Sequence, residues 1–179
     1  LAPGTNQLNV FGGVEVDLPD DLEELTNGRP RIVTAWNGRG FARIPITNAP
    51  GAIYFADRPH DLGGSPLESN DDVVTELTAA GLELTELEAI TIDGVDVRVI
   101  DVGSTDVGAI ALRFSPLDTA LPYLGWDVPA SGRIWLIEHP DRGLMMMSTH
   151  AFENVDEMLP IVTELGEAIV ESMQFIDLG

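Results

Sequence analysis

The chain has 179 residues, 44% of them apolar, so its composition excludes a disordered chain and permits one domain with a core of its own. Thirty acidic residues against nine basic ones give a net charge of −21, which excludes nucleic acid and anionic membrane surfaces as partners held by charge. All nine basic residues are Arg and Cys is absent, which excludes a lysine Schiff base, a thiol nucleophile and a disulfide.

The first third of the chain predicts short strands. Residues 1–9 are expected to be an N-terminal stub or linker, and residues 10–179 a single domain. Apolar and polar residues alternate from Val14 to Leu18, which is typical of a strand with one buried face. Pro45 cannot donate a backbone hydrogen bond, so its strand is expected at a sheet edge. Further strands are predicted over 31–36, 41–46 and 52–57, the first two joined by a hairpin turn.

A short helix is predicted after a loop over residues 58–69. Asn70 can cap the N-terminus of this helix, and Gly81 suits the position just after its last turn. Apolar residues recur at helical spacing between these two positions, so one face of the helix is expected to be buried. That stripe consists of Val73, Val74, Leu77 and Ala80.

A β-hairpin is predicted around Asp93-Gly94, because this dipeptide favours a two-residue turn. Apolar residues flank the turn on both sides, so the two strands can be paired outward from it. The predicted partners are Ile92 with Val95, Ile90 with Val97, and Leu87 with Ile100.

A second hairpin is predicted over residues 133–150, RIWLIEHPDRGLMMMSTH, around the turn-forming PDRG. Outward pairing from that turn opposes His139 with Leu144, and Met146 then faces away from the methionines on either side of it. His150 lies about 20 Å from the partner of His139 at ~3.3 Å per residue, so no metal site is expected here. Apolar residues on both faces of both arms place this strand pair near the centre of the sheet.

An amphipathic helix is predicted over residues 155–173, followed by a terminal strand or extended segment. Strands punctuated by two helices predict an α+β fold, in which an antiparallel sheet is flanked by helices as an α/β/α sandwich. The apolar stripe of the last helix comprises Met158, Val162, Leu165, Ile169 and Met173, and the opposite face carries Glu157, Glu164, Glu167 and Glu171.

No motif in the chain predicts catalysis. The G-x-S-x-G elbow, the phosphate-binding and dinucleotide-binding glycine patterns and the calcium-loop pattern are all absent from the sequence. Thirty carboxylates always permit some acid pair, so the acids by themselves point to no hydrolytic site. We therefore predict no catalytic residue, no metal and no cofactor.

A binding surface is the remaining candidate for a functional site, and we expect it in the long segment over residues 115–132. Long loops inside compact domains are often functional, although covering a sheet edge is an alternative role for this segment. The segment follows a strand predicted over 109–114. Aromatic side chains and Arg are enriched at binding surfaces, so Tyr123, Trp126 and Arg113 are the predicted binding residues.

The order of elements resembles the PsbP-like family, which includes actinobacterial LpqN-type lipoproteins. The resemblance is carried by VEVDLPDDLEE, ITIDGVDVRVIDV, RIWLIEH and LPIVTELGEAIVESMQFI, with Ser172 and Phe175 matching the Ser-x-x-Phe ending of the family's last helix. It implies an antiparallel sheet between helices and a non-enzymatic protein that binds protein partners or assists lipid export in the cell envelope. No catalytic residues follow from the resemblance.

Three functions stand as hypotheses. The first is a non-catalytic exported binding protein, an envelope lipoprotein with a lipid anchor upstream, which interacts with an envelope protein or a lipid. The second is a hydrolase that uses a carboxylate pair or a His–carboxylate pair, and the third is a carrier of a small hydrophobic ligand. No transmembrane segment is predicted, and an extracytoplasmic location is expected. The acidic, lysine-free composition alternatively fits the cytoplasm of a salt-adapted organism.

Overall fold

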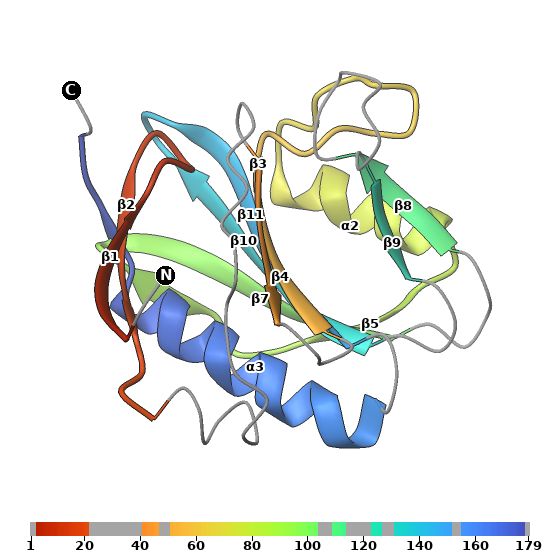
Figure 1. The fold of residues 1–179 in the computed structure, drawn as a ribbon. Coiled ribbons are helices and arrows are strands. Elements are labelled where there is room, and N and C mark those ends of the chain that lie inside the picture. The colour runs from red at the N-terminus through yellow and green to blue at the C-terminus, as the bar shows by residue number, and fades with distance from the viewer. Residues whose placement is uncertain are drawn as a thin grey trace.

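An antiparallel sheet forms the centre of the fold (Figure 1). The computed structural model describes residues 3–21, 41–46, 51–103, 109–113, 123–126, 131–151 and 155–177. The strands of the central sheet are β3 (Phe41–Ile46), β4 (Gly51–Asp57), β5 (Glu83–Glu86), β6 (Ile90–Ile92), β7 (Val95–Gly103), β10 (Ser131–His139) and β11 (Gly143–Ala151). They follow the order β3-β4-β11-β10-β7-β5, and β6 also pairs with β7.

Two smaller sheets and two helices complete the described fold. They are built from β1 (Gly4–Leu8), β2 (Val14–Leu18), β12 (Gln174–Phe175), β8 (Ala109–Arg113), β9 (Tyr123–Trp126), α2 (Asn70–Ala79) and α3 (Val155–Ser172). Strands β1, β2 and β12 form one sheet, and β8 pairs with β9. In Figure 1, α3 and the β1–β2 strands lie to one side of the central sheet, and α2 with β8 and β9 lies to the other. The fold is α+β, an antiparallel sheet flanked by helices, as predicted.

The hairpin of β10 and β11 lies in the middle of the strand order, but its register differs from the prediction by one residue. His139 pairs with Gly143 and Glu138 with Leu144, so the predicted pairing of His139 with Leu144 is wrong. The turn closes through the Arg142 N–H, which donates to the His139 carbonyl at 3.3 Å. Gly143 follows with φ of 79°, a left-handed conformation that a glycine adopts without steric cost. The turn therefore uses one residue fewer than the sequence suggested.

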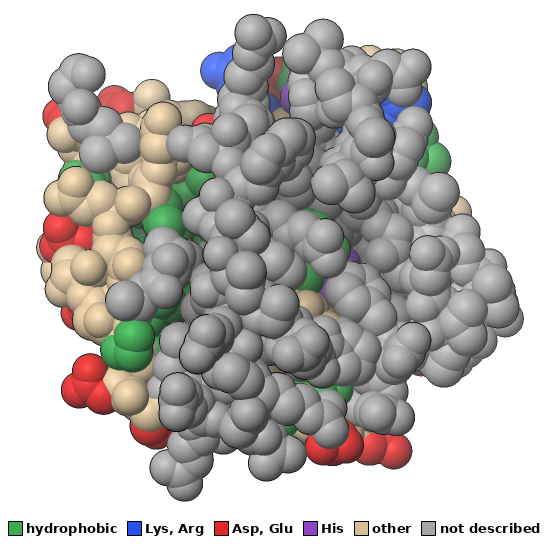
Figure 2. Space-filling view, in the orientation of Figure 1, with side chains coloured by type: hydrophobic (Ala, Val, Ile, Leu, Met, Phe, Trp, Pro, Cys, Tyr) green, Lys and Arg blue, Asp and Glu red, His purple; other side chains and the backbone are tan. Residues whose placement is uncertain are grey.

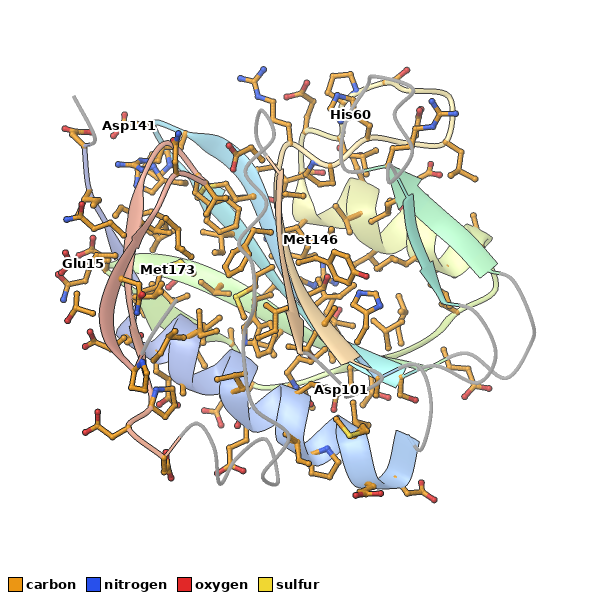
Figure 3. The ribbon with its side chains drawn as sticks, in the orientation of Figure 1. Glu15, His60, Asp101, Asp141, Met146 and Met173 are labelled. Atoms are coloured by element: carbon orange, nitrogen blue, oxygen red, sulfur yellow. The ribbon has the colours of Figure 1, made fainter. Side chains whose placement is uncertain are left out.

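The observed register sorts the apolar side chains of this hairpin into two cores. Met146 does face away from its methionine neighbours, as predicted, but it shares a face with Leu136 rather than with Trp135. Figure 3 labels Met146 on the side of α2. The core on the α3 side contains Trp135, Ile137, Met145 and Met147, and the core on the α2 side contains Ile134, Leu136, Leu144 and Met146.

Helix α3 packs closely on the central sheet. A Cβ built on Gly166 would lie 2.5 Å from Thr149 Cγ2 and 2.8 Å from Trp135 Cη2, so this position requires glycine for the helix to approach the strands. The predicted apolar stripe is confirmed, because Met158, Val162, Leu165, Ile169 and Met173 are all buried.

Helix α2 covers the opposite face and begins one residue earlier than expected. Ser69, not Asn70, is the N-cap, and its hydroxyl accepts from the Asp72 N–H while the Asp72 carboxylate accepts from the Ser69 N–H. Gly81 has φ of 82° after the last turn, as predicted. Of the predicted stripe, Val73 and Leu77 are fully buried, and Val74 and Ala80 pack against the same core.

The β6–β7 hairpin is confirmed next to its turn. Asp93 and Gly94 have φ of 48° and 81°, and the two predicted strand pairs nearest to them are present. Farther out, Ile100 pairs with Glu86 instead of Leu87, because an irregularity between β5 and β6 shifts the register by one residue. This irregular segment forms one side of a pocket that faces α3.

Three further expectations concern the first part of the chain, and they have different outcomes. Residues 4–8, within the expected stub, form β1 and pair with β2. Strand β3, which contains Pro45, ends the described strand order, in agreement with the edge position predicted from that proline. The strand predicted over 31–36 and the turn that follows it lie outside the described residues.

The turn between β1 and β2 is fastened to the rest of the molecule by one cation and one carboxylate. Arg142 Nη1 donates to the carbonyls of Phe11 at 2.6 Å and Gly13 at 2.9 Å, and Nη2 donates to the carbonyl of Ile176 at 3.2 Å. Asp57 Oδ1 accepts from the Phe11 N–H at 2.6 Å. Phe11 itself has φ of 57°, so these bonds hold a backbone conformation that phenylalanine seldom adopts.

Substituting Gly132 should destabilise the fold strongly. A Cβ on Gly132 would lie 1.9 Å from the Thr149 carbonyl oxygen, so β10 and β11 must separate to accept even alanine. Gly132→Ala should lower the free energy of unfolding by about 3 kcal/mol, the upper end for an overpacked site. Gly103→Ala is the matched control, because a Cβ on Gly103 has no atom within 4 Å. Equal losses in urea denaturation of the two variants would contradict this account.

Asp57 should make stability depend on pH between about 4 and 6. Burial raises the pKa of Asp57 from 3.8 to about 6, against the opposing effects of the Phe11 hydrogen bond and the Arg142 charge. In this window the unfolded chain releases a proton that the folded chain keeps, so stability falls as pH rises, by up to about 3 kcal/mol. In the Asp57→Asn variant, the free energy of unfolding should lose this dependence on pH. Urea denaturation at several pH values checks this, and an unchanged difference between acid and neutral pH would refute it.

Candidate functional site

A pocket of about 190 Å³ lies between the C-terminal half of α3 and the irregular segment that joins β5 to β6. We call it the α3 pocket. Its lining residues are Leu87, Glu88, Ile90, Val99, Arg133, Trp135, Glu167, Val170 and Glu171. The lining comes from four parts of the chain, so only the folded sheet and helix bring these side chains together.

The floor of the α3 pocket is apolar. Arg133 and Trp135 are two residues apart on β10, so both point to the α3 side of the sheet, and Val99 of β7 pairs with Trp135. Val170 of α3 is fully buried beside them, and Trp135 is 1% exposed. Leu87 contributes an apolar wall at the other side and is only partly buried. Trp135 and Val170 therefore close the base of the pocket, and the apolar surface open to a ligand is mainly that of the partly buried Leu87 and Ile90.

Arg133 supplies a cation to this lining, and two carboxylates hold it. Nε donates to Asp101 Oδ1 at 2.6 Å and Nη2 to Asp101 Oδ2 at 3.1 Å, while Nη1 donates to Glu167. The side chain of Arg133 is only 17% exposed. The hydrogen bonds with Asp101 raise the pKa of Arg133, so the guanidinium is permanently charged. Asp101 is labelled in Figure 3, next to α3.

The rim of the pocket is acidic. Glu88, on the β5–β6 segment, and Glu171, on α3, are both exposed lining residues. Within the described part of the chain no cation pairs with either of them. One guanidinium, that of Arg133, therefore stands among four carboxylates, those of Asp101, Glu167, Glu88 and Glu171. In the view of Figure 2, acidic side chains are also scattered along the left and lower edges of the described surface.

The chemistry and the size of the lining limit what the pocket can accept. The lining offers carboxylates and one guanidinium, and none of its described residues carries a hydroxyl, thiol or imidazole group. Its volume is below the ~300–1,000 Å³ typical of sites for small molecules, so it fits a single side chain or a fragment of similar size. Among the described residues, no group of three or more His, Asp or Glu side chains is placed to hold a metal ion.

The predicted binding residues lie elsewhere, on the β8–β9 pair. Arg113 and Tyr123 are cross-strand partners, and Trp126 pairs with Ala109, so both aromatic residues belong to a strand and not to a loop. The backbone of Arg113 also exchanges two hydrogen bonds with His60, at 2.8 and 2.9 Å. The side chains of Tyr123 and Trp126 lie outside the described residues, so a binding surface formed by these residues stays a prediction.

A second polar cluster is buried in the core on the α2 side. Ser148 Oγ and His150 Nε2 lie 3.1 Å apart, and the ring of His150 packs edge-on against Tyr54 with 4.8 Å between centroids. Pairing with Gly132 and Ala52 on the two neighbouring strands leaves room for the imidazole. A serine bonded to an imidazole is a possible nucleophile–base pair, but Ser148 and His150 are 0% and 1% exposed. Such burial keeps substrates away, so we assign this pair to the core.

Sequence reasoning missed the residues of the α3 pocket. Glu167 was expected on the solvent face of its helix, whereas it is half-buried and bonded to Arg133. One signal was present in the sequence, because four apolar residues follow Arg133 in its strand, and a charge at such a site needs a partner. Nothing local identified Asp101 and Glu167 as those partners, because they are 32 and 34 residues away in sequence.

No protein-family model matches the chain, and no curated protein matches it. Within the described residues, no helix has both the length and the apolar character that crossing a membrane requires.

Replacing Arg133 by lysine should cost stability, because one ammonium cannot reproduce the bidentate contact with Asp101 and still reach Glu167. We expect Arg133→Lys to lower the free energy of unfolding by about 1.5 kcal/mol. The matched control is Arg98→Lys, because Arg98 also contacts two carboxylates, those of Glu86 and Asp71, but its side chain is more exposed at 30%. Thermal or urea denaturation should rank Arg133→Lys as the more harmful change, and the reverse ranking would contradict this assignment.

Proposed function

We propose that the protein is a non-catalytic binding protein and that the α3 pocket is its binding site. The observation that carries the proposal is that an apolar floor and two carboxylates without a described partner, Glu88 and Glu171, face one concave space. Concave apolar sites with a few polar groups are the usual form of a recognition site. Anchor pockets of this size commonly receive one side chain of a partner at the centre of a protein interface.

Binding is preferred to hydrolysis because of where the acids lie. Glu88 and Glu171 are exposed, whereas catalytic acids are usually enclosed by apolar or charged groups that adapt them to proton transfer. Glu167 and Asp101 are already engaged by Arg133. A carrier of a wholly hydrophobic ligand fits less well, because the pocket is small and its rim is charged.

The resemblance to the PsbP-like family supports a more specific form of this proposal. In that form the protein is exported, is held in the cell envelope by a lipid anchor upstream of the described domain, and binds another envelope protein. The net charge of −21 favours partners with basic surfaces, since opposite charge accelerates encounter. The strands that carry Arg113, Tyr123 and Trp126 lie on the other side of the central sheet (Figure 1), so a binding surface formed by these residues would be a separate contact region.

A survey with small probes tests the binding site. N-acetyl amides of norleucine, phenylalanine, glutamate and arginine represent apolar, aromatic, anionic and cationic side chains. Each is titrated into the ¹⁵N-labelled protein, and the amide signals of Glu88, Val170 and Glu171 are followed by NMR. At least one class should shift these signals in a saturable way.

A matched pair of variants makes the survey specific. Glu171→Trp places a large ring at the rim of the pocket and should abolish the shifts. Glu164→Trp makes the same chemical change two helical turns away, about 10 Å along α3, at an exposed residue outside the lining, and should leave the shifts intact. The proposed function is wrong if no probe class shifts the pocket signals, or if both variants behave alike.

A further inference from the structure

We propose that the α3 pocket receives a basic side chain, a guanidinium or ammonium group on an aliphatic stem, from a basic segment of a partner protein. The inference rests on the proposed function and goes beyond it by naming the chemistry of the occupant. Three features of the described residues carry it: the charge around the mouth, the apolar floor, and the size of the space.

The charge around the pocket selects a cation. Arg133 is compensated by Asp101 and Glu167, which hold three of its N–H groups, so its charge is matched locally. Glu88 and Glu171 remain, and they stand on opposite walls, one on the β5–β6 segment and the other on α3. A cation placed between them would be attracted by both, whereas an anion would be repelled by both. Charge complementarity therefore excludes acidic and phosphorylated occupants.

The apolar floor selects a long stem beneath that charge. Leu87 and Ile90 line the pocket together with the acidic residues and are partly exposed, so an occupant can lie against them. Arg and Lys side chains bury their methylene groups on apolar surface while the charged head stays near water. Such a side chain would contact the apolar lining with its methylene groups and the rim carboxylates with its charged head. A bare metal cation would use the carboxylates but leave the apolar surface unused.

The size and the charge of the whole chain point to another protein as the source. A space of about 190 Å³ accepts one side chain but is small for a free metabolite, for which sites of ~300–1,000 Å³ are usual. A second copy of this chain is disfavoured, because each copy carries a net charge of −21 and the two would repel each other. A basic segment of a different protein meets both conditions, with flanking positive charges drawn to the surrounding acidic surface.

Two peptides that differ only in charge test this inference. Acetyl-Ala-Ala-Arg-Ala-Ala-amide is compared with the same peptide in which citrulline, the uncharged isostere of arginine, replaces the arginine. Both are titrated into the ¹⁵N-labelled protein at low salt, and dissociation constants are taken from the signals of Glu88, Val170 and Glu171. We expect the arginine peptide to bind about tenfold more tightly, because two carboxylates each contribute a few-fold at an exposed site.

Matched charge variants locate the effect. Glu171→Gln should weaken binding of the arginine peptide about threefold and leave the citrulline peptide unaffected. Glu164→Gln removes the same charge outside the lining and should change neither. Raising the salt concentration should weaken only the arginine peptide.

The outcomes separate this inference from the proposed function. Equal binding of the arginine and citrulline peptides, or equal effects of the two Gln variants, would overturn the inference. The same holds if the survey of small probes finds that only norleucine, phenylalanine or glutamate amides occupy the pocket, and the proposed function then still stands. If no probe of any class occupies the pocket, the proposed function fails and takes the inference with it.

Discussion

Burial of the β10–β11 hairpin on both of its faces is the constraint on which the rest of the structure depends. Trp135 and Met147 point to one side of the sheet, and Leu136 and Met146 to the other, and all four are at most 1% exposed. A strand pair with two apolar faces needs a covering layer on each side. Helix α3 and α2 supply those layers, and the flanking strands β4 and β7 complete the backbone hydrogen bonds of the hairpin. The sandwich is therefore the consequence of one doubly buried hairpin.

Helix α3 covers only part of one face of the central sheet, and the α3 pocket lies where this cover ends. Gly166 brings the helix into contact with Thr149 and Trp135, over β10 and β11. Near β7, the segment that joins β5 to β6 covers the sheet instead of the helix. The space between this segment and α3 is the α3 pocket. Arg133 lies at that boundary, where an apolar strand meets a more polar margin, and its bonds to Asp101 and Glu167 tie β7, β10 and α3 together. The same contacts that stabilise this margin thus shape the proposed site.

The carboxylates of the chain have different roles at different positions in the structure. Most of the carboxylates that the structure describes lie on exposed surface, where single ion pairs contribute little to stability. At the margin of the sheet, by contrast, Asp101 and Glu167 compensate a poorly exposed cation, and Glu88 and Glu171 line the α3 pocket without a cationic partner among the described residues. Asp57 differs again, because burial holds its proton into the mildly acidic range while it anchors Phe11. Net charge alone therefore could not indicate which of these roles a given carboxylate has.

Local periodicity and turn chemistry were enough to predict most of the described helices and strands, although not β1 or β9. The stripe of α3, the Gly81 end of α2, the Asp93-Gly94 turn and the two-faced central hairpin follow from side chains within a few residues of one another, and each was predicted correctly. The register of β10 on β11 was predicted wrongly. The sequence PDRG is compatible with a turn of three residues or of four, and the choice between them shifts every cross-strand pair by one residue. The β1 strand and the N-cap at Ser69 were also missed. The α3 pocket depends on contacts between residues more than thirty positions apart, such as Arg133 with Asp101 and Glu167, and only the tertiary packing of helix on sheet decides which distant charges meet.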